Sequence, residues 1–242
     1  MISVILPTRS GRLNTLIQSI DSLFLTCKNS SNIELLVGVD VDDVEQKNKI
    51  DLYIKDNSNY NIRIIITEKS KYLELYKKVN VLYNSCSNTK WILFFSDDAI
   101  MLSNNWDVNI LRHNDDFKLL RARLHGWETN WTALFPIVPK KWPDVQGHFS
   151  MSPQIDLYMS YMGRDLDLLI DEYDIEITMI PPNGQQHTEI PFIYEPVLLA
   201  KEPTSYVGNA NNRKIIDTNF ISAKQKIKQY LTEKKINFFD GN

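Results

Sequence analysis

The sequence predicts an α/β fold in which helices cover both faces of a mostly parallel central sheet. Within the first 110 residues, four apolar runs alternate with stretches of helical periodicity. The runs are apolar throughout, which is typical of strands buried on both faces of a parallel sheet. The repeated order of strand and helix also favours right-handed crossovers between neighbouring parallel strands.

The first unit is a strand and a crossover helix. The apolar run at 2–6 stops at Pro7, and a polar turn over 8–11 follows. The spacing of the next apolar residues is that of one face of an amphipathic helix. These residues are Leu13, Leu16, Ile17, Ile20, Leu23, Phe24 and Cys27.

The same unit recurs along the chain. Further strands are expected at 33–39, 63–67 and 91–95, and helices at 44–56 and 75–86. The run at 91–95 is wholly apolar, and the four runs together imply a parallel sheet that is covered on both faces.

Beyond residue 110 the pattern is less regular. Strand-like runs lie at 119–124 and 133–138, but prolines interrupt the stretch from Gly126 to Pro153, which predicts a loop-rich insertion there. A helix with apolar positions between Ile155 and Leu169 is expected next, followed by a strand at 176–180.

Composition excludes several classes of protein. The chain has 242 residues, 43% hydrophobic and 24% charged, which is enough apolar material for a core and unlike a disordered protein. A formal net charge of −3 gives no reason to expect a nucleic acid partner. Two cysteines exclude a disulfide framework or a zinc ribbon. No apolar run has the length of a signal peptide core or a membrane span, so we expect a soluble, cytoplasmic protein.

The glycines exclude the usual phosphate-binding loops. Eight glycines occur, and none stands in a G-x-G-x-x-G or G-x-x-x-x-G-K-[ST] arrangement. Such loops hold a dinucleotide or a triphosphate by backbone amides. Any phosphate group must therefore be held another way.

Two pairs of acidic residues follow predicted strands. Asp40 and Asp42 come after the second strand, and Asp97 and Asp98 come after the fourth. Ligands of open parallel sheets bind beyond the carboxyl ends of the strands, so both pairs are expected at one edge. Carboxylates crowded together repel each other unless a cation intervenes, and oxygen ligands favour Mg²⁺ or Mn²⁺. Alternatively, these residues only cap turns and helices.

With these residues the sequence resembles a known family. The segments ISVILPTRSGR, ELLVGVDVDD and WILFFSDDAI, together with a helix that carries Asn80, resemble nucleotide-sugar-dependent glycosyltransferases of the GT-A fold, especially the family 2 type. The resemblance covers about residues 1–195. It implies that Asp98 binds a divalent metal and that a further set of residues contacts the nucleotide. The members of that set are Pro7, Thr8, Arg9, Asp40 or Asp42, and Asp97.

The resemblance extends to the second half of the chain. It implies a catalytic base at Asp156, at the start of a helix, and a histidine that can complete the metal shell at His187, 31 positions later. The chain departs from the family pattern at Ile155, where Glu is usual, and at Ser96, where the first acid of a D-x-D motif would stand. Without the resemblance, Asp156 would equally well be a helix cap, and His187 a core or surface residue.

The resemblance implies one GT-A-like domain over 1–212. Its nucleotide-binding half would cover 1–110 and its acceptor-binding half 111–195, the latter loop-rich. Three tryptophans lie in the proline-broken segment of the second half, where their rings could form an acceptor wall or simply fill the core. They are Trp127, Trp131 and Trp142.

The implied activity is transfer of a sugar from a nucleoside diphosphate sugar to a hydroxyl of a glycan or a related acceptor. A Mn²⁺ or Mg²⁺ ion at Asp98 would neutralise the diphosphate leaving group. Asp156 would take the proton of the acceptor hydroxyl, with inversion at the anomeric carbon. Two alternatives remain: a catalytically silent nucleotide-sugar-binding module, and a metal-dependent nucleotidyltransferase, although the Gly-rich loop and lysine usual in the latter are missing.

A basic helix and tail are expected over 213–242. Between 213 and 235 the chain has seven lysines and arginines against two acids. Such a helix can make peripheral contact with an anionic membrane or with a partner, although lysines of this kind more often form a solvated face. Its apolar side would consist of Phe220, Ile221, Ile227, Tyr230 and Leu231.

Overall fold

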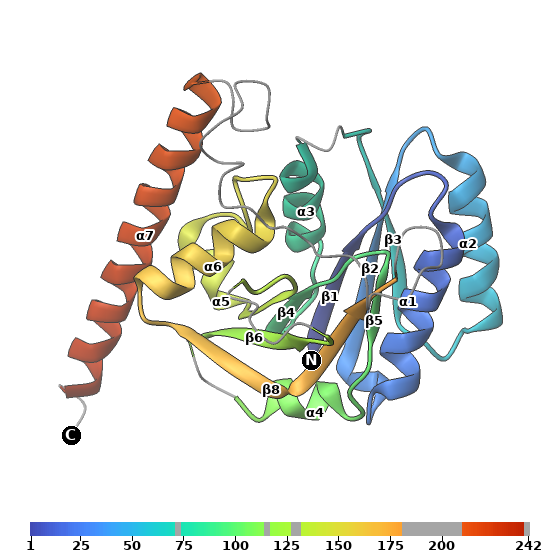
Figure 1. The fold of residues 1–242 in the computed structure, drawn as a ribbon, viewed down its shortest axis with the longest axis horizontal. Coiled ribbons are helices and arrows are strands. Elements are labelled where there is room, and N and C mark those ends of the chain that lie inside the picture. The colour runs from blue at the N-terminus through green and yellow to red at the C-terminus, as the bar shows by residue number, and fades with distance from the viewer. Residues whose placement is uncertain (71–73, 114–116, 127–131, 181–209, 240–242) are drawn as a thin grey trace.

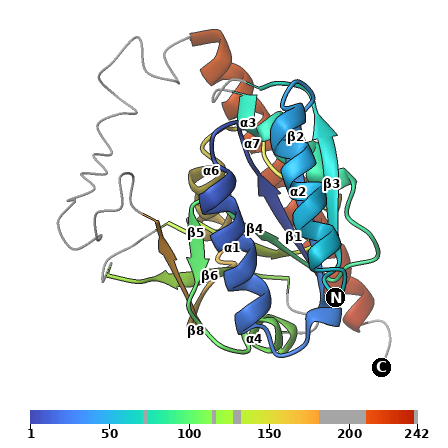
Figure 2. The same ribbon diagram turned by 90° about the vertical axis from the view of Figure 1, so that its right-hand side faces the viewer.

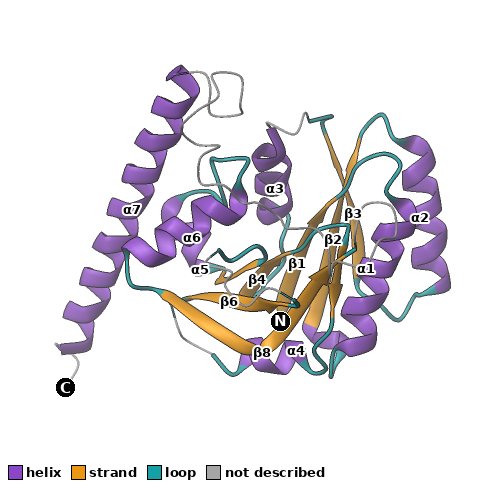
Figure 3. Cartoon of the chain, in the orientation of Figure 1, coloured by secondary structure: helices purple, strands orange, loops and turns teal. Residues whose placement is uncertain are grey.

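The protein is described here from a computed structural model, which covers residues 1–239 apart from 71–73, 114–116, 127–131 and 181–209. In the last helix, the side chains of residues 218–234 are described. A central eight-stranded sheet runs through the molecule, with helices on both sides of it (Figures 1 and 3). The strands are β1 (Ile2–Pro7), β2 (Ile33–Asp40), β3 (Ile62–Thr67), β4 (Trp91–Phe94), β5 (Ala99–Met101), β6 (Leu119–Leu124), β7 (Pro136–Pro139) and β8 (Leu169–Met179).

The described helices lie where the sequence predicts them, except for two short helices at 106–111 and 141–146 that were not predicted. The described helices are α1 (Leu13–Thr26), α2 (Val44–Asp56), α3 (Leu75–Asn84), α4 (Trp106–Leu111), α5 (Lys141–Gln146), α6 (Ile155–Asp165) and α7 (Ala210–Phe239). A 3₁₀ turn, η1 (Ser30–Asn32), precedes β2. No helix in the described part of the chain combines the length and the apolar composition of a membrane span.

The strand order places a crevice between β1 and β4. The sheet has the order β3-β2-β1-β4-β7-β6-β8-β5, and the first four strands in this order are parallel. The chain moves outward from β1 to β3 and then returns to the other side of β1 to form β4. In open α/β sheets, ligands bind at such a reversal of strand order, beyond the carboxyl ends of the strands.

Alternate residues of the central strands face two separate cores. Val4, Leu35 and Leu93 pack in one core with residues of α1, α2 and α4. Ile5 and Leu36 pack in the other core with residues of α3, α5, α6 and α7. Figure 2 shows α1 and α2 in front of β1, β2 and β3, with α7 behind them. The prediction of a sheet covered on both faces, with buried parallel strands in its first half, is confirmed.

The second half of the sheet is mixed rather than parallel. β7 is antiparallel to β4 and β6, β5 is antiparallel to β8, and only β6 and β8 are parallel. The strand predicted at 176–180 begins earlier, at Leu169. The predicted helix ends at Asp165, so Leu169, expected on it, opens the strand instead. The part of β8 that follows was missed because it is charged: Arg121 of β6 pairs with Asp171, and Arg112 Nη1 lies 2.7 Å from Asp174 Oδ2.

The proline-broken stretch also contains regular structure. Pro136 and Pro139 are the first and last residues of β7, where a missing N–H group is best tolerated in a strand. Pro143 stands in the first turn of α5, where its missing N–H would have no intrahelical partner. The prolines therefore bound short elements instead of excluding them, and β7 joins the two halves of the sheet.

The apolar side of α7 packs against the domain. Ala223 and Ile227 are fully or almost fully buried in the second core. The ring of Phe220 lies edge-on to Tyr158 of α6, 5.4 Å between centroids, and Lys224 Nζ lies 2.5 Å from Asp165 Oδ2. The apolar side that the sequence offers for membrane contact is thus mostly covered by the domain, apart from Ile221, which is 56% exposed.

Candidate functional site

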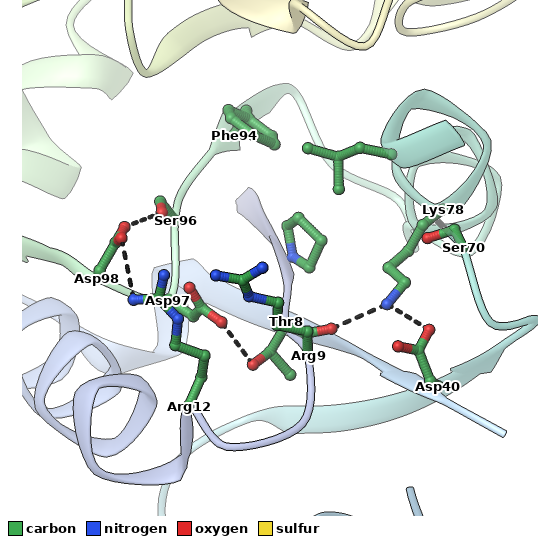
Figure 4. Close-up of a pocket in the computed structure, with 12 residues that line it drawn as sticks. Thr8, Arg9, Arg12, Asp40, Ser70, Lys78, Phe94, Ser96, Asp97 and Asp98 are labelled. Carbon is green, nitrogen blue, oxygen red and sulfur yellow. Dashed lines mark hydrogen bonds and ion pairs between the residues drawn. The ribbon is translucent and has the colours of Figure 1, made fainter. Parts of the chain in front are cut away.

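A pocket of about 280 Å³ opens at the carboxyl ends of β1, β2 and β4. Figure 4 shows its side chains arranged between the turn after β1, the end of β2, α3 and the turn after β4. Because these strands meet at the reversal of strand order, the pocket lies where the topology predicts a ligand. The lining residues are Pro7, Thr8, Arg9, Arg12, Asp40, Ser70, Leu75, Lys78, Phe94, Ser96, Asp97 and Asp98.

One end of the pocket contains a buried ion pair. Asp40 is the last residue of β2, and its Oδ1 lies 2.6 Å from Nζ of Lys78, which projects from α3. The Lys78 ammonium also donates a hydrogen bond of 2.8 Å to the carbonyl oxygen of Thr8. Since only 3% and 10% of the two side chains are exposed, neither charge is screened by bulk water. The pair therefore fixes the orientation of the Asp40 carboxylate (Figure 4).

A chain of hydrogen bonds holds Asp97 at the other end. Thr8 donates from Oγ1 to Asp97 Oδ2 over 2.7 Å, and Gln46 of α2 donates from Nε2 to Thr8 Oγ1 over 3.2 Å. Burial raises the pKa of Asp97, the Thr8 hydrogen bond opposes this shift, and the neighbouring Asp98 charge reinforces it. The ionised form of Asp97 is thus disfavoured by burial and by the Asp98 charge, and a nearby cation would stabilise it.

Asp98 makes polar contacts on both carboxylate oxygens. Arg12 Nη1 lies 3.3 Å from Oδ2, and the hydroxyl of Ser96 donates to Oδ1. The backbone carbonyl of Asp98 also accepts a 2.6 Å hydrogen bond from the N–H of Ile180, just beyond β8. Side-chain exposures of 31% for Arg12 and 18% for Asp98 leave this pair within reach of a ligand in the pocket.

The pocket suits an anionic ligand together with a divalent cation. Its lining carries three cations, Arg9, Arg12 and Lys78, against three carboxylates, Asp40, Asp97 and Asp98. Among the described residues, there is no group of three or more His, Cys, Asp or Glu side chains that could hold a metal ion without further ligands. Two adjacent carboxylates nevertheless fit Mg²⁺ or Mn²⁺, because such ions are commonly held by one or two carboxylates and completed by ligand phosphates and water.

The structure brings together most of the residues that the sequence assigns to the nucleotide and the metal. Pro7, Thr8, Arg9, Asp40, Asp97 and Asp98 all line the pocket.

Asp42 lies outside this lining. Its half-exposed carboxylate pairs at 2.6 Å with Lys69 Nζ, which lowers the pKa of Asp42. The capping role in this turn belongs to Asp43, whose Oδ1 accepts a hydrogen bond from the Gln46 N–H. Of the two acids that the resemblance assigns to the nucleotide after the second strand, Asp40 is therefore the one in the pocket.

Two further predicted site residues also lie outside the lining. Asp156 is the second residue of α6, so it is not the N-cap, which is Gln154. Trp142 is fully buried in α5 and stacks on Phe117, with ring centroids 5.3 Å apart. The prediction that Trp142 contacts an acceptor is therefore wrong, because its side chain fills the core and has no exposed surface.

The other predicted site residues, His187, Trp127 and Trp131, lie outside the described residues.

Lys78 and Arg12 are pocket residues that the motifs did not reveal. The sequence contained a signal for Lys78: a lysine lies between Leu75 and Leu82 on the buried stripe of α3, where an apolar side chain is expected. A buried lysine requires a carboxylate partner, and Asp40 supplies it. Arg12 carried no such signal, because it precedes α1 in a polar turn.

Comparison with solved structures supports the fold at low sequence identity. S. aureus TarS 1–349 in complex with UDP-GlcNAc has a TM-score of 0.56 at 14% identity, over 78% of this chain and 61% of that one. The mannosyltransferase PcManGT from Pyrobaculum calidifontis, in complex with GDP-Man and Mn²⁺, has a TM-score of 0.59 at 10% identity, over 76% and 58%. GalNAc-T7 with UDP, GalNAc and Mn²⁺ has a TM-score of 0.61 at 12% identity, over 80% and 46%.

No protein-family model and no curated protein sequence matches this chain. The chain spans 46–61% of the length of these three solved structures. At these identities the likeness establishes the fold, which is the GT-A-like fold that the sequence resemblance implies.

Proposed function

We propose that the protein is a glycosyltransferase that transfers a sugar from a nucleoside diphosphate sugar to a hydroxyl of a glycan or a related acceptor. The observation that carries the proposal is the pocket at the β1–β4 reversal, where Asp40, Asp97 and Asp98 alternate with three cationic side chains. Donor complexes of the structurally similar TarS and PcManGT support this choice of ligand. The resemblance of the pocket-forming segments to family 2 enzymes supports it independently.

The two ends of the pocket suit the two ends of a nucleoside diphosphate. Asp40, oriented by Lys78, can accept hydrogen bonds from the N–H groups of a uracil or guanine base. The guanidinium groups of Arg9 and Arg12 can donate to phosphate oxygens. Asp97 can accept a hydrogen bond from a ribose hydroxyl while it keeps its hydrogen bond to Thr8.

Asp98, with Asp97 beside it, would hold Mn²⁺ or Mg²⁺, and His187 is a further proposed ligand. When bound, such an ion supplies positive charge that stabilises a diphosphate leaving group. Because Arg12 contacts Asp98, that carboxylate is presented toward the pocket before any ligand enters. Ser96, in the place of the first acid of D-x-D, contributes a hydroxyl that orients Asp98 instead of a third carboxylate.

The proposed catalytic base is Asp156. Asp156 is a half-buried acid in the first turn of α6, and transfer with inversion requires a base on the face opposite the leaving group. Trp127 and Trp131 are proposed to contact the sugar of the acceptor, because flat aromatic rings pack well on the apolar faces of sugars.

The test is nucleotide binding with and without metal. UDP and GDP are titrated calorimetrically into the wild type and Asp98→Asn, in Mn²⁺ and in EDTA. We expect Mn²⁺-dependent binding of one nucleotide by the wild type and a loss of at least about tenfold in affinity in the variant, since a charged ligand to the metal is removed. Asp51→Asn, an exposed acid of α2 paired with Lys47, is the matched control and should bind as the wild type does. Equal affinity in Asp98→Asn and the wild type would count decisively against the assignment.

A catalytically silent nucleotide-sugar-binding module is the second candidate. Two observations favour it: Ile155 stands where family members carry Glu, and Asp156 is absent from the lining of the described pocket. Incubation with UDP- and GDP-sugars in Mn²⁺ separates the two candidates. An enzyme releases free nucleoside diphosphate slowly even without acceptor, whereas a silent module binds the donor and releases none.

A further inference from the structure

A second cavity lies at the opposite end of β4 from the donor pocket. Its volume is about 790 Å³, and it is formed where the turn before β4, the start of α5 and the last part of α7 meet. Thr89 and Lys90 precede β4, whereas Ser96 and Asp98 follow it, so the two sites lie roughly 20 Å apart along the strand. The lining residues of this cavity belong to no part of the proposed donor site.

Segments far apart in the sequence bring four lysines to this cavity. Lys90 comes from the turn before β4, Lys140 and Lys141 from the start of α5, and Lys234 from α7. We call these four residues the lysine groove. The N–H of Lys140 donates a 2.8 Å hydrogen bond to the carbonyl of Lys90, which fixes the first two segments to each other. α7 is held against α5 by the buried contacts of its apolar side.

The lysine groove carries an excess of positive charge. The one acidic residue in the lining, Asp144, already accepts from Lys140 Nζ at 2.8 Å and from the Tyr83 hydroxyl at 2.7 Å. Among the described residues, Lys141 and Lys234 have no acidic partner. In a chain with a formal net charge of −3, such a concentration of like charge in one concavity is unfavourable unless an anion compensates it.

Aromatic side chains form one wall of the groove. The ring of Phe117 stacks on buried Trp142 and lies 5.0 Å from the ring of Tyr230. Lys141 Nζ lies 5.5 Å from the centroid of Tyr230, within the range of a cation–π contact, so its ammonium stays beside the aromatic wall. The groove thus offers charge to an anion and an apolar face to the organic part of the same molecule.

We propose that the lysine groove is a second ligand site that binds a phosphate-bearing molecule. Several lysine ammonium groups around one concavity suit a phosphate with more than one negative charge. The volume is that of a small-molecule site, and the net negative charge of the whole chain disfavours an extended polyanion. The phosphate can belong to a soluble molecule or to the headgroup of an anionic lipid, since both present the same group.

The test uses inorganic tripolyphosphate as the soluble probe, titrated calorimetrically in EDTA. Lys141→Gln/Lys234→Gln removes two exposed lysines of the groove, and Lys47→Gln/Lys49→Gln, which removes two lysines of α2, is the charge-matched control. The proposal predicts a loss of affinity of about tenfold or more in the groove variant and a change of less than about twofold in the control. Equal losses in both variants, or none in either, would overturn the proposal.

A second arm identifies the source of the phosphate. The same three proteins are sedimented with vesicles of phosphatidylcholine, with and without phosphatidylglycerol. Binding to the anionic vesicles that is lost only in the groove variant assigns the site to a lipid headgroup, whereas tripolyphosphate binding without vesicle binding assigns it to a soluble ligand. If neither probe binds the wild type, the proposal fails. The proposed glycosyltransferase activity is unaffected by any of these outcomes, because nucleotide binding is measured at the other end of β4.

Discussion

At the scale of single residues, Arg12 is the pocket side chain whose role the geometry makes most specific. It contacts Asp98 at 3.3 Å and lies at the mouth of the same pocket as Arg9. A guanidinium in this position can exchange a carboxylate oxygen for a phosphate oxygen without leaving the pocket, because both accept the same hydrogen bonds. Arg12 therefore connects the proposed metal ligand to the proposed diphosphate.

Arg12→Gln should weaken nucleoside diphosphate binding in Mn²⁺ by about ten- to a hundredfold, the value of one or two charge-assisted hydrogen bonds. Calorimetric titration with the nucleotide that the wild type binds is the measurement. Lys69→Gln removes a positive charge from the same edge of the sheet but outside the pocket, and it should bind normally. If both variants lose affinity equally, the effect is one of net charge and Arg12 has no specific contact.

A second prediction concerns a buried histidine. Nε2 of His148 lies 2.9 Å from the Tyr158 hydroxyl, and burial, with a smaller effect of Lys226, lowers the pKa of His148 from 6.5 to about 4. Between these values the unfolded chain binds a proton that the folded chain excludes, so the free energy of unfolding decreases as the pH falls from 6.5 toward 4. In His148→Gln the free energy of unfolding should decrease less over this pH range, because the titrating group is removed. Urea denaturation of the wild type and the variant at pH values above 6.5 and near 4 measures the two free energies, and an unchanged pH dependence in the variant would contradict the prediction.

At the scale of elements, α7 is an integral part of the second core. Ile227 is fully buried, whereas Ile221, on the same helix, is 56% exposed. Ile227→Ala should therefore lower the free energy of unfolding by about 2 to 4 kcal/mol, as for other large-to-small core substitutions. Ile221→Ala should change it by less than about 0.5 kcal/mol. Chemical denaturation of the two variants is the measurement, and similar small effects from both would show that α7 is not docked as described.

The sequence predicts elements well where burial is uniform and poorly where ion pairs compensate charge. The strands of the first half were found because each is mostly apolar, as β2 shows, and β4 is apolar from end to end. The start of β8 was missed because Asp171, Glu172 and Asp174 look like a loop until Arg121 and Arg112 are placed beside them. Partners so distant in sequence leave no local pattern, and β5, with three residues, is too short to have one.

At the scale of the whole molecule, the sequence predicts which residues lie at the site, because the topology of the sheet determines their position. Acids that follow strands of a parallel sheet must lie at one edge, and Asp40, Asp97 and Asp98 do. What topology does not determine is the direction of each side chain. Asp42 is two residues from Asp40, yet it pairs with Lys69 outside the pocket, and Trp142 faces the core rather than an acceptor. Such outcomes depend on packing partners that a single sequence does not identify.

All of the described residues that line the donor pocket lie between Pro7 and Asp98, so no described residue after Asp98 adds a side chain to it. Substitutions at the described positions after residue 98 can accumulate without replacing a side chain of that lining, provided that the shared strands keep their packing. Under the proposed function, lineages that descend from a common ancestor could thus exchange one recipient molecule for another while they inherit the same activated precursor.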